Sequence, residues 1–288
     1  MGKEGFYIRT DKLEDLYNIG KKVSLILSDV CPTTLRAAQA EKISEKVLLH
    51  CNSIIKLFDM AQEDYSELDI ALIASAARNI MDSGNVYFYV TERGISEEEV
   101  QFRYNLQIMN YEKNVKDIFR KLKFPMDSYK MRLLDHDFVI KEIKETSIYS
   151  EADENEKKRI LSGKPFFRRK STGIFSLETE SAIFNILSNS IHSFYIGLSN
   201  NSINRSLVFN SYIDPVMLCI ISVETAMIYT ANILYDYLQL RKQLGRTLAR
   251  EEREQIKALR STEFLEAYLK EQRDRFGRGF LQVNRNIQ

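Results

Sequence analysis

Helix-breaking residues are scarce in this chain, whose 288 residues include only 4 prolines and 11 glycines. Long stretches without either residue favour helices over the short strands and turns of an all-β protein. Cysteine is scarce as well: Cys31, Cys51 and Cys219 lie far apart and form no CxxC pair. This spacing argues against a disulfide scaffold and is typical of a reducing compartment. The first residues also lack the apolar segment of a secretion signal, so we expect a cytoplasmic protein.

An excess of one sign of charge is also lacking, since 41 Lys and Arg residues oppose 40 Asp and Glu residues. A nearly neutral chain argues against a protein whose whole surface binds nucleic acid. The distribution is uneven, because residues 241–288 contain 12 basic and 7 acidic residues, a net charge of +5. Residues 1–240 therefore carry a net charge of −4, which gives +1 for the whole chain. A basic C-terminal segment follows a mildly acidic body.

We expect an all-α protein, an irregular bundle of roughly eight or nine helices. The expected helices cover about residues 11–30, 32–62, 68–91, 96–122, 126–146, 177–198, 215–240 and 248–276. The chain then divides into an N-terminal helical hairpin (1–66), a main helical bundle (67–245), and a charged C-terminal helix with its tail (246–288). Charged residues, glycines and a proline mix within residues 151–175, which predicts a long irregular basic loop there.

One long apolar run follows Pro215 and is long enough to cross a bilayer. Glu224 lies in its middle, where a charge is costly in lipid. We therefore interpret the run as the central core helix of a protein that does not enter a membrane. A carboxylate inside such a helix needs a partner, and the candidates are Arg78, Arg103 and Arg205.

Two apolar helices carry polar stripes, and these stripes are the best candidate site. At about 3.6 residues per turn, Arg78 and Asp82 share one face of the expected helix 68–91. Ser188 and His192 share one face of the expected helix 177–198 by the same spacing. Buried charged groups need polar partners, so we expect the two stripes to meet. An ion pair within the first helix is the simpler interpretation of Arg78 and Asp82.

Catalytic roles can be assigned to these four residues if the stripes form an open site. His192 would act as acid or base near neutral pH beside the Arg78 and Asp82 pair. Ser188 would orient the substrate or attack it. The alternative is a structural histidine in a closed polar network, with both ring nitrogens satisfied inside the protein.

A short basic segment is the second candidate for ligand binding. Two adjacent phenylalanines lie among four basic side chains, a pattern that can hold single-stranded nucleic acid by charge and stacking. The segment consists of Lys164, Phe166, Phe167, Arg168, Arg169 and Lys170, with Pro165 between the first two. A solvated loop anchored by its phenylalanines is the alternative. The charged C-terminal helix is expected to be solvated or to face another copy in a homo-oligomer.

Several short motifs occur along the chain in an order similar to that found in a known group of proteins. The motifs are Arg78-x-x-x-Asp82, Tyr87-Phe88-Tyr89, Phe102-Arg103, the basic loop, and Leu187-Ser188-x-x-x-His192-Ser193. Over about residues 68–240 the chain resembles a bacterial all-helical family of unknown function that looks related to the HEPN superfamily. The resemblance implies a HEPN-like core, frequent dimerisation, and RNA cleavage in toxin or phage-defence settings. It also adds Arg103 to the candidate binding residues.

The chain departs from this family at the catalytic motif. Catalytic HEPN ribonucleases carry an arginine followed by four to six residues and a histidine on one helix. Ser83 and Gly84 stand where that histidine would follow Arg78, and Arg132 precedes His136 by too few residues. Metal-independent ribonuclease activity would therefore need a composite site from two helices.

Other cofactor chemistry has little support in the sequence. No phosphate-binding or dinucleotide-binding glycine motif occurs, and Asp135-His136-Asp137 lacks the further ligands of a metal site. We therefore expect no metal and no cofactor. The expected function is a defence-type or stress-type protein that acts on or binds RNA or nucleotide. The alternative is a non-catalytic interaction or scaffold protein.

Overall fold

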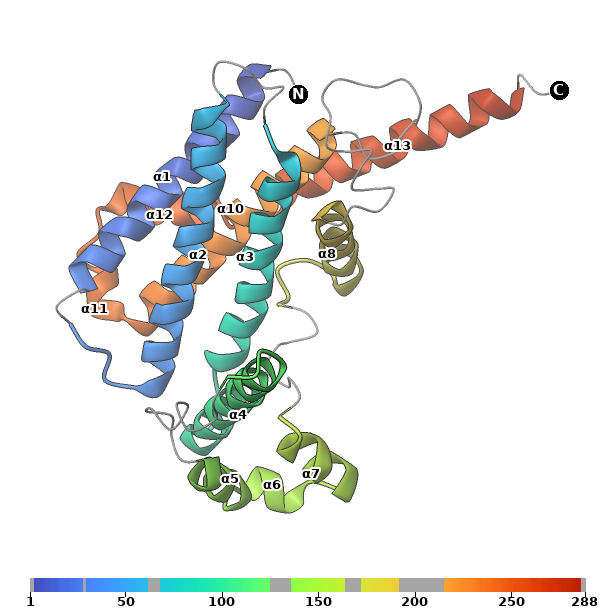
Figure 1. Ribbon diagram of the computed structural model, residues 1–288. Coiled ribbons are helices and arrows are strands. Elements are labelled where there is room, and N and C mark those ends of the chain that lie inside the picture. The colour runs from blue at the N-terminus through green and yellow to red at the C-terminus, as the bar shows by residue number, and fades with distance from the viewer. Residues whose placement is uncertain are drawn as a thin grey trace. The chain divides into compact units, whose positions relative to one another are not determined.

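The chain folds into helices, as its composition predicts. The computed structural model describes residues 3–27, 30–61, 68–124, 136–163, 172–191 and 215–285. Within these ranges all regular structure is helical and no strand occurs, as Figure 1 shows. The all-α class is therefore confirmed. Short helices between the long ones raise the number of helices above the eight or nine expected from the sequence.

The structure divides into two compact units whose sequences interleave. Unit 1 comprises residues 1–31, 43–84 and 171–288, and unit 2 comprises residues 32–42 and 85–170. The described helices of unit 1 are α1 (Lys3–Leu27), most of α2 (Leu35–Met60), most of α3 (Ile70–Val90), α8 (Leu177–Ile191), α10 (Pro215–Leu240), α11 (Lys242–Gly245), α12 (Arg250–Ala258) and α13 (Glu263–Arg285). Unit 2 contains the start of α2, the end of α3, α4 (Glu97–Lys121), α5 (His136–Lys144), α6 (Ser147–Glu151) and α7 (Glu154–Leu161).

Helix α10 is the centre of unit 1. It contacts α1, α8, α11 and α12, and its residues from Met217 to Ala231 are all buried. The helix is long and apolar enough to span a membrane, and 89% of its most apolar window is buried within the protein. Burial on all sides explains why α10 is apolar around its whole circumference, as expected for a core helix.

Glu224 has a partner that the sequence did not indicate. Its side chain is 1% exposed, and both carboxylate oxygens accept hydrogen bonds from the Nε and Nη2 atoms of Arg9. The expected partners Arg78 and Arg103 were therefore wrong, and the third candidate, Arg205, lies outside the described residues. Arg9 lies on α1, which packs directly on α10, and its guanidinium also lies 4.5 Å from the ring centre of Phe264. Helix packing across the sequence, rather than proximity along it, selects the partner.

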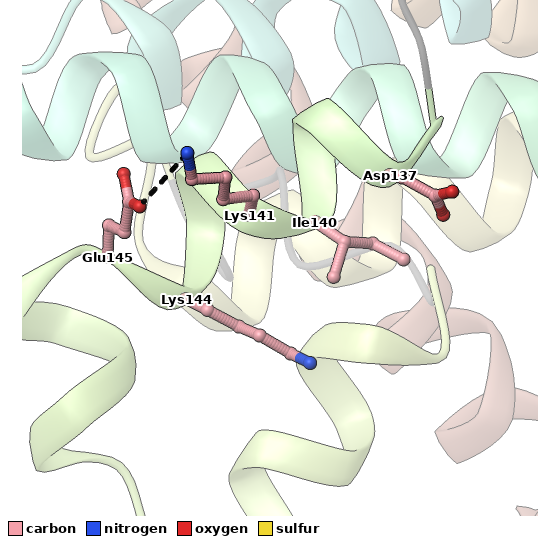
Figure 2. Close-up of a pocket in the computed structure, with 5 residues that line it drawn as sticks. All are labelled: Asp137, Ile140, Lys141, Lys144 and Glu145. Carbon is pink, nitrogen blue, oxygen red and sulfur yellow. Dashed lines mark ion pairs between the residues drawn. The ribbon is translucent and has the colours of Figure 1, made fainter.

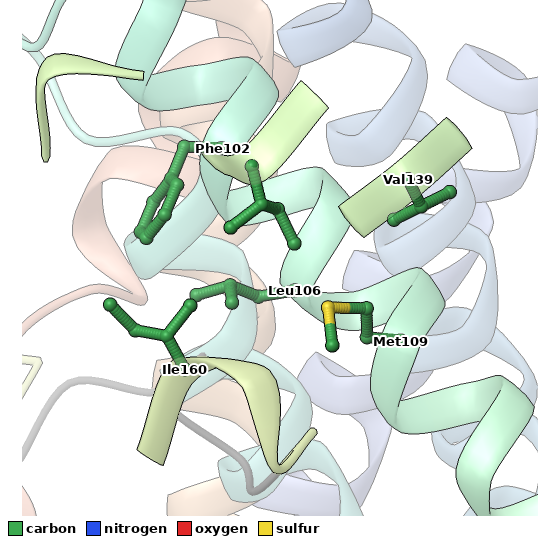
Figure 3. Packing of buried hydrophobic residues seen from close by; sticks show 6 residues of the cluster. Phe102, Leu106, Met109, Val139 and Ile160 are labelled. Carbon is green, nitrogen blue, oxygen red and sulfur yellow. The ribbon is translucent and has the colours of Figure 1, made fainter. Parts of the chain in front are cut away.

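Unit 2 has its own small core around α4. Phe102, Leu106 and Met109 line one face of this helix and pack against Val139 and Ile143 of α5 and Ile160 of α7 (Figure 3). The start of α4 is capped, since the Ser96 hydroxyl accepts a hydrogen bond from the Glu99 amide at 3.1 Å.

The expected irregular loop at residues 151–175 begins with a helix, so that part of the prediction was wrong. Asp153 caps α7 by accepting from the Glu156 amide at 2.8 Å, and Ile160 is buried in the core of unit 2. Gly163 ends this segment with a φ of 61°, a conformation that glycine adopts without strain. One cap and one buried side chain hold this helix of eight residues, five of which are charged.

The expected C-terminal helix is two helices in the structure. Helix α12 ends at Ala258 and α13 begins at Glu263. Between them Arg260 lies in a turn, and its Nε donates a hydrogen bond to Asn232 Oδ1 of α10 at 3.0 Å. This contact fixes the connection to the core helix.

Candidate functional site

The two polar stripes meet in unit 1 at Arg78 and Ser188. Arg78 Nε on α3 donates to Ser188 Oγ on α8 at 3.0 Å, and Arg78 Nη2 lies 3.3 Å from Asp82 Oδ2. The same guanidinium lies 5.1 Å from the ring centre of Phe184, one turn before Ser188 on α8. Arg78 is therefore held by a hydroxyl, a carboxylate and an aromatic ring. We call these four residues the Arg78 site.

Solvent reaches this site. The side chains of Arg78 and Asp82 are 31% and 30% exposed. No partner is assigned to Arg78 Nη1 among the described residues. The guanidinium thus has a fixed orientation and keeps hydrogen-bond donors that a ligand can reach.

His192 lies outside the described residues, which on α8 end at Ile191. The predicted proximity of His192 to Arg78 therefore stays a prediction. Ser188 precedes His192 by four residues in the sequence, and its hydroxyl accepts a hydrogen bond from Arg78 in the structure.

A second buried network fixes the other end of α8. Glu180 is 4% exposed and accepts hydrogen bonds from the Thr172 amide at 3.1 Å, from the Thr172 hydroxyl, and from Tyr229 Oη at 2.7 Å. Burial first, and then the neighbouring Glu180, raise the pKa of Tyr229 well above its usual range, so the phenol stays a donor. Helix α8 is therefore held to α10 at Glu180 and to α3 at Ser188.

The contact between α3 and α10 depends on Gly84. A Cβ atom at this position would lie 2.5 Å from Tyr229 Cδ1. The glycine therefore lets the Tyr229 ring pass close to the α3 backbone, two residues beyond Asp82. Sequence reasoning missed Glu180, Thr172 and Tyr229 as residues that position the site. The signals were a glycine inside an apolar helix and a tyrosine inside the core helix.

Arg103, a predicted binding residue, lies in a dense internal network of unit 2. Its Nη1 donates to Glu92 at 2.8 Å and to the Tyr89 carbonyl, and its Nε donates to Glu99 at 3.0 Å. The guanidinium lies 4.1 Å from the Tyr89 ring centre, and the residue is 8% exposed. Burial alone would lower the pKa of Arg103, but the hydrogen bonds to Glu92 and Glu99 raise it above its usual value. Arg103 joins the end of α3 to α4, and its role in binding stays a prediction.

The predicted basic segment, residues 164–170, lies outside the described residues. The residues on either side of it are held firmly. In unit 2, Asn110 donates to the Gly163 carbonyl at 2.8 Å, and Lys113 donates to the Ser162 carbonyl at 2.6 Å. In unit 1, Glu180 holds Thr172.

A hollow of about 450 Å³ lies along α5 in unit 2 (Figure 2). Its lining residues are Asp137, Ile140, Lys141, Lys144 and Glu145. Lys141 and Glu145 form an ion pair of 3.7 Å, and their side chains are 70% and 61% exposed. These solvated charges do not converge on one point. In the described part of the chain, no three His, Cys, Asp or Glu side chains are placed to hold a metal ion.

Comparisons with known proteins add no assignment. No protein-family model matches the chain, and neither curated proteins nor solved structures give a significant match.

Proposed function

We propose that the protein binds RNA or a nucleotide through a phosphate group held at the Arg78 site. The observation that carries this proposal is a guanidinium fixed by Ser188, Asp82 and Phe184 that is still 31% exposed. An arginine oriented in advance loses less side-chain freedom when it binds an anion. The cytoplasmic location and the defence-type or stress-type role remain parts of this proposal that rest on sequence alone.

Each neighbour of Arg78 has a chemical role in this proposal. Arg78 Nη1 and the second Nη2 proton donate to phosphate oxygens, and the Ser188 hydroxyl adds a further hydrogen bond. Phe184 keeps the guanidinium plane in place from one side. Asp82 holds Nη2 in the absence of ligand, and its negative charge weakens the binding of simple anions. The site therefore favours ligands that make contacts beyond one phosphate.

Catalysis is a further step of the same proposal. His192 follows Ser188 by one helical turn in the sequence and would act as acid or base on a bound phosphodiester. Such a reaction needs no metal ion, so RNA cleavage would persist in excess EDTA. His192→Ala would abolish cleavage and leave RNA binding and helical content unchanged.

The binding experiment compares two arginines with similar surroundings. Arg260 also lies against an aromatic ring, 3.8 Å from the Tyr235 ring centre, and also donates to one neutral side chain, Asn232. Fluorescence anisotropy with labelled single-stranded RNA would measure affinity for wild type, Arg78→Ala and Arg260→Ala over a range of salt concentrations. Both variants remove one positive charge, so a difference in RNA affinity between them depends on the position of the arginine.

We expect Arg78→Ala to weaken RNA binding about tenfold or more, since a hydrogen bond to a charged group contributes about 1.5–3 kcal/mol. Arg260→Ala should change affinity by less than about threefold at the same salt concentration. If both variants lost the same affinity for RNA, net charge alone would explain the effect. That result would overturn the assignment of the Arg78 site. Failure of the folded wild type to bind RNA or nucleotide would overturn the proposed function.

An interaction protein is the second candidate function, and a separate observation favours it. Helix α4 of unit 2 exposes a row of large apolar side chains, including Tyr111, Ile118 and Leu122. Exposed apolar rows of this kind mark surfaces that bind other proteins. In this case the Arg78 site would serve only to join α3 to α8.

A further inference from the structure

Helix α4 carries two apolar faces, and the second of them is only partly covered in unit 2. The second face follows spacings of four and three residues in alternation, which is the heptad pattern of a coiled coil. Its members, which we call the α4 seam, are Tyr104, Ile108, Tyr111, Val115, Ile118 and Leu122. At about 100° per residue, Tyr111 lies opposite the core residue Phe102. From Tyr111 onward the seam therefore faces away from the core of the unit.

The seam is open to solvent over its C-terminal half. Tyr111, Ile118 and Leu122 are 57%, 51% and 58% exposed. Val115 is half-buried between them, as are Tyr104 and Ile108 nearer the start of the helix. Ile108 also packs against the edge of the unit 2 core. Single exposed apolar residues are common on protein surfaces, whereas a row along one helix face is not.

The C-terminal end of the seam has a defined geometry. Lys123 has a φ of 56°, and the Phe124 amide donates to the Phe119 carbonyl at 2.9 Å. This bond and the left-handed residue are the features of a Schellman cap. The Phe119 and Phe124 rings meet edge to face with centres 5.4 Å apart, which is the apolar contact typical of that cap. Leu122 is thus presented by a fixed helix end.

We propose that the α4 seam binds the same seam of a second copy of this chain, with the two helices antiparallel. The seam is self-complementary in this orientation, because each a position meets a d position of the second copy. Tyr104 would lie opposite Leu122, Ile108 opposite Ile118, and Tyr111 opposite Val115. All six seam residues find an apolar partner in this single register.

Charge selects the antiparallel orientation. The end of α4 is basic, with Arg120, Lys121 and Lys123, and its start is acidic, with Glu97 to Glu99. Parallel helices would bring the two basic ends together, and this repulsion is costly at low salt. In the antiparallel register Lys121 lies opposite Gln107, and the basic ends are separated by the length of the seam.

The contact area predicts a weak dimer. The seam spans 19 residues from Tyr104 to Leu122, or about 28 Å of helix. Two helices of this length bury less than the roughly 800 Å² per partner of a standard stable interface. The dimer should therefore form and dissociate over an accessible range of protein concentration. This inference concerns unit 2 alone and does not depend on ligand binding at the Arg78 site.

The first experiment measures the association of the full chain by sedimentation velocity as a function of concentration. We expect wild type to shift from monomer to dimer, and Ile118→Glu with Leu122→Glu to remain monomeric with unchanged circular dichroism. Leu49→Glu is the matched control, since Leu49 is 67% exposed on another helix. A wild type that stays monomeric at its highest soluble concentration would overturn the proposal. A dimer that both seam substitutions leave intact would overturn it as well.

The second experiment tests orientation and does not depend on the seam substitutions. Asn114 is exposed and flanks the centre of the proposed register, whereas Lys121 lies near its end. In a Cys31→Ser background, a short bis-maleimide should link Asn114→Cys chains to each other but not Lys121→Cys chains. Cys51 and Cys219 are buried and would not compete. Equal cross-linking at both positions would overturn the antiparallel arrangement.

Discussion

Two arginine–carboxylate pairs among the described residues of unit 1 differ chiefly in their access to water. Glu224 on α10 is 1% exposed and binds Arg9 through both carboxylate oxygens. Asp82 on α3 is 30% exposed and meets Arg78 through one close contact of 3.3 Å. A guanidinium–carboxylate pair therefore occurs once in a buried and once in a solvent-exposed environment within unit 1.

The comparison separates a structural role from a role in binding. A buried pair must remain intact, because either partner alone would leave an uncompensated charge away from water. A pair that is one-third exposed contributes little to stability, since water and salt screen it. The open pair can therefore rearrange when a ligand arrives, while the buried pair cannot.

The largest effect is expected at the buried pair. Arg9→Met should lower the free energy of unfolding by about 3–5 kcal/mol, because it strands the Glu224 carboxylate in the core. Arg9→Met with Glu224→Leu should recover most of this loss, since no charge is then buried. Chemical denaturation monitored by circular dichroism measures both variants. If Arg9→Met lowered the free energy of unfolding by less than about 1 kcal/mol, the Glu224 carboxylate would not be buried away from water.

A smaller effect is expected where α3 meets α10. Gly84→Ala should lower the free energy of unfolding by about 1–3 kcal/mol, because the added methyl group meets the Tyr229 ring. In a Tyr229→Leu background the ring is gone, so the same substitution should cost less. A double-mutant cycle measures this coupling. Equal costs in both backgrounds would contradict the close approach of Gly84 and Tyr229.

The dry core of unit 1 should also make stability sensitive to alkaline pH. Burial raises the pKa of Cys51 to about 12 despite its contact with Thr230, and burial raises the pKa of Cys219 to about 12. An unfolded thiol has a pKa of about 8.5. The folded thiols thus contribute stability that is complete below about pH 8.5 and is lost as pH rises toward 12.

Denaturation from pH 8 to pH 11 measures this loss. Replacing Cys51 and Cys219 with alanine should flatten the pH dependence, whereas Cys31→Ala, at an exposed position, should leave it unchanged. In the native protein at pH 8, a thiol reagent should modify Cys31 alone. Rapid labelling of the other two cysteines would show that water enters the core.

Sequence reasoning predicted what depends on periodicity and failed where contacts cross the chain. The apolar run of α10 is a local signal, and the structure confirms that it forms a buried core helix. The partner of Glu224 lies more than two hundred residues away, so no pattern near α10 could name Arg9. The three segments expected in chain order contrast with two units that interleave in sequence, because tertiary packing, rather than chain order, defines a unit.

The candidate site shows the same division. Helical spacing placed Arg78 beside Asp82, and the need to satisfy polar groups suggested a partner on the second stripe, where Ser188 is found. The residues that hold α8 in position, Glu180 and Tyr229, gave no periodic signal. Sequence reasoning did not single out the α4 seam, although its heptad spacing is present in the sequence. Its exposure required the fold, because a helix with two apolar faces does not reveal which one is buried.

One measurement tests the central claim most directly: the RNA affinity of Arg78→Lys at fixed salt. Lysine keeps the charge but loses the planar guanidinium that Ser188, Asp82 and Phe184 orient. If the Arg78 site binds phosphate by its geometry, Arg78→Lys should weaken binding nearly as much as Arg78→Ala. Both variants should unfold within about 1 kcal/mol of wild type. Wild-type affinity in Arg78→Lys would contradict the claim, because charge alone would then explain the binding.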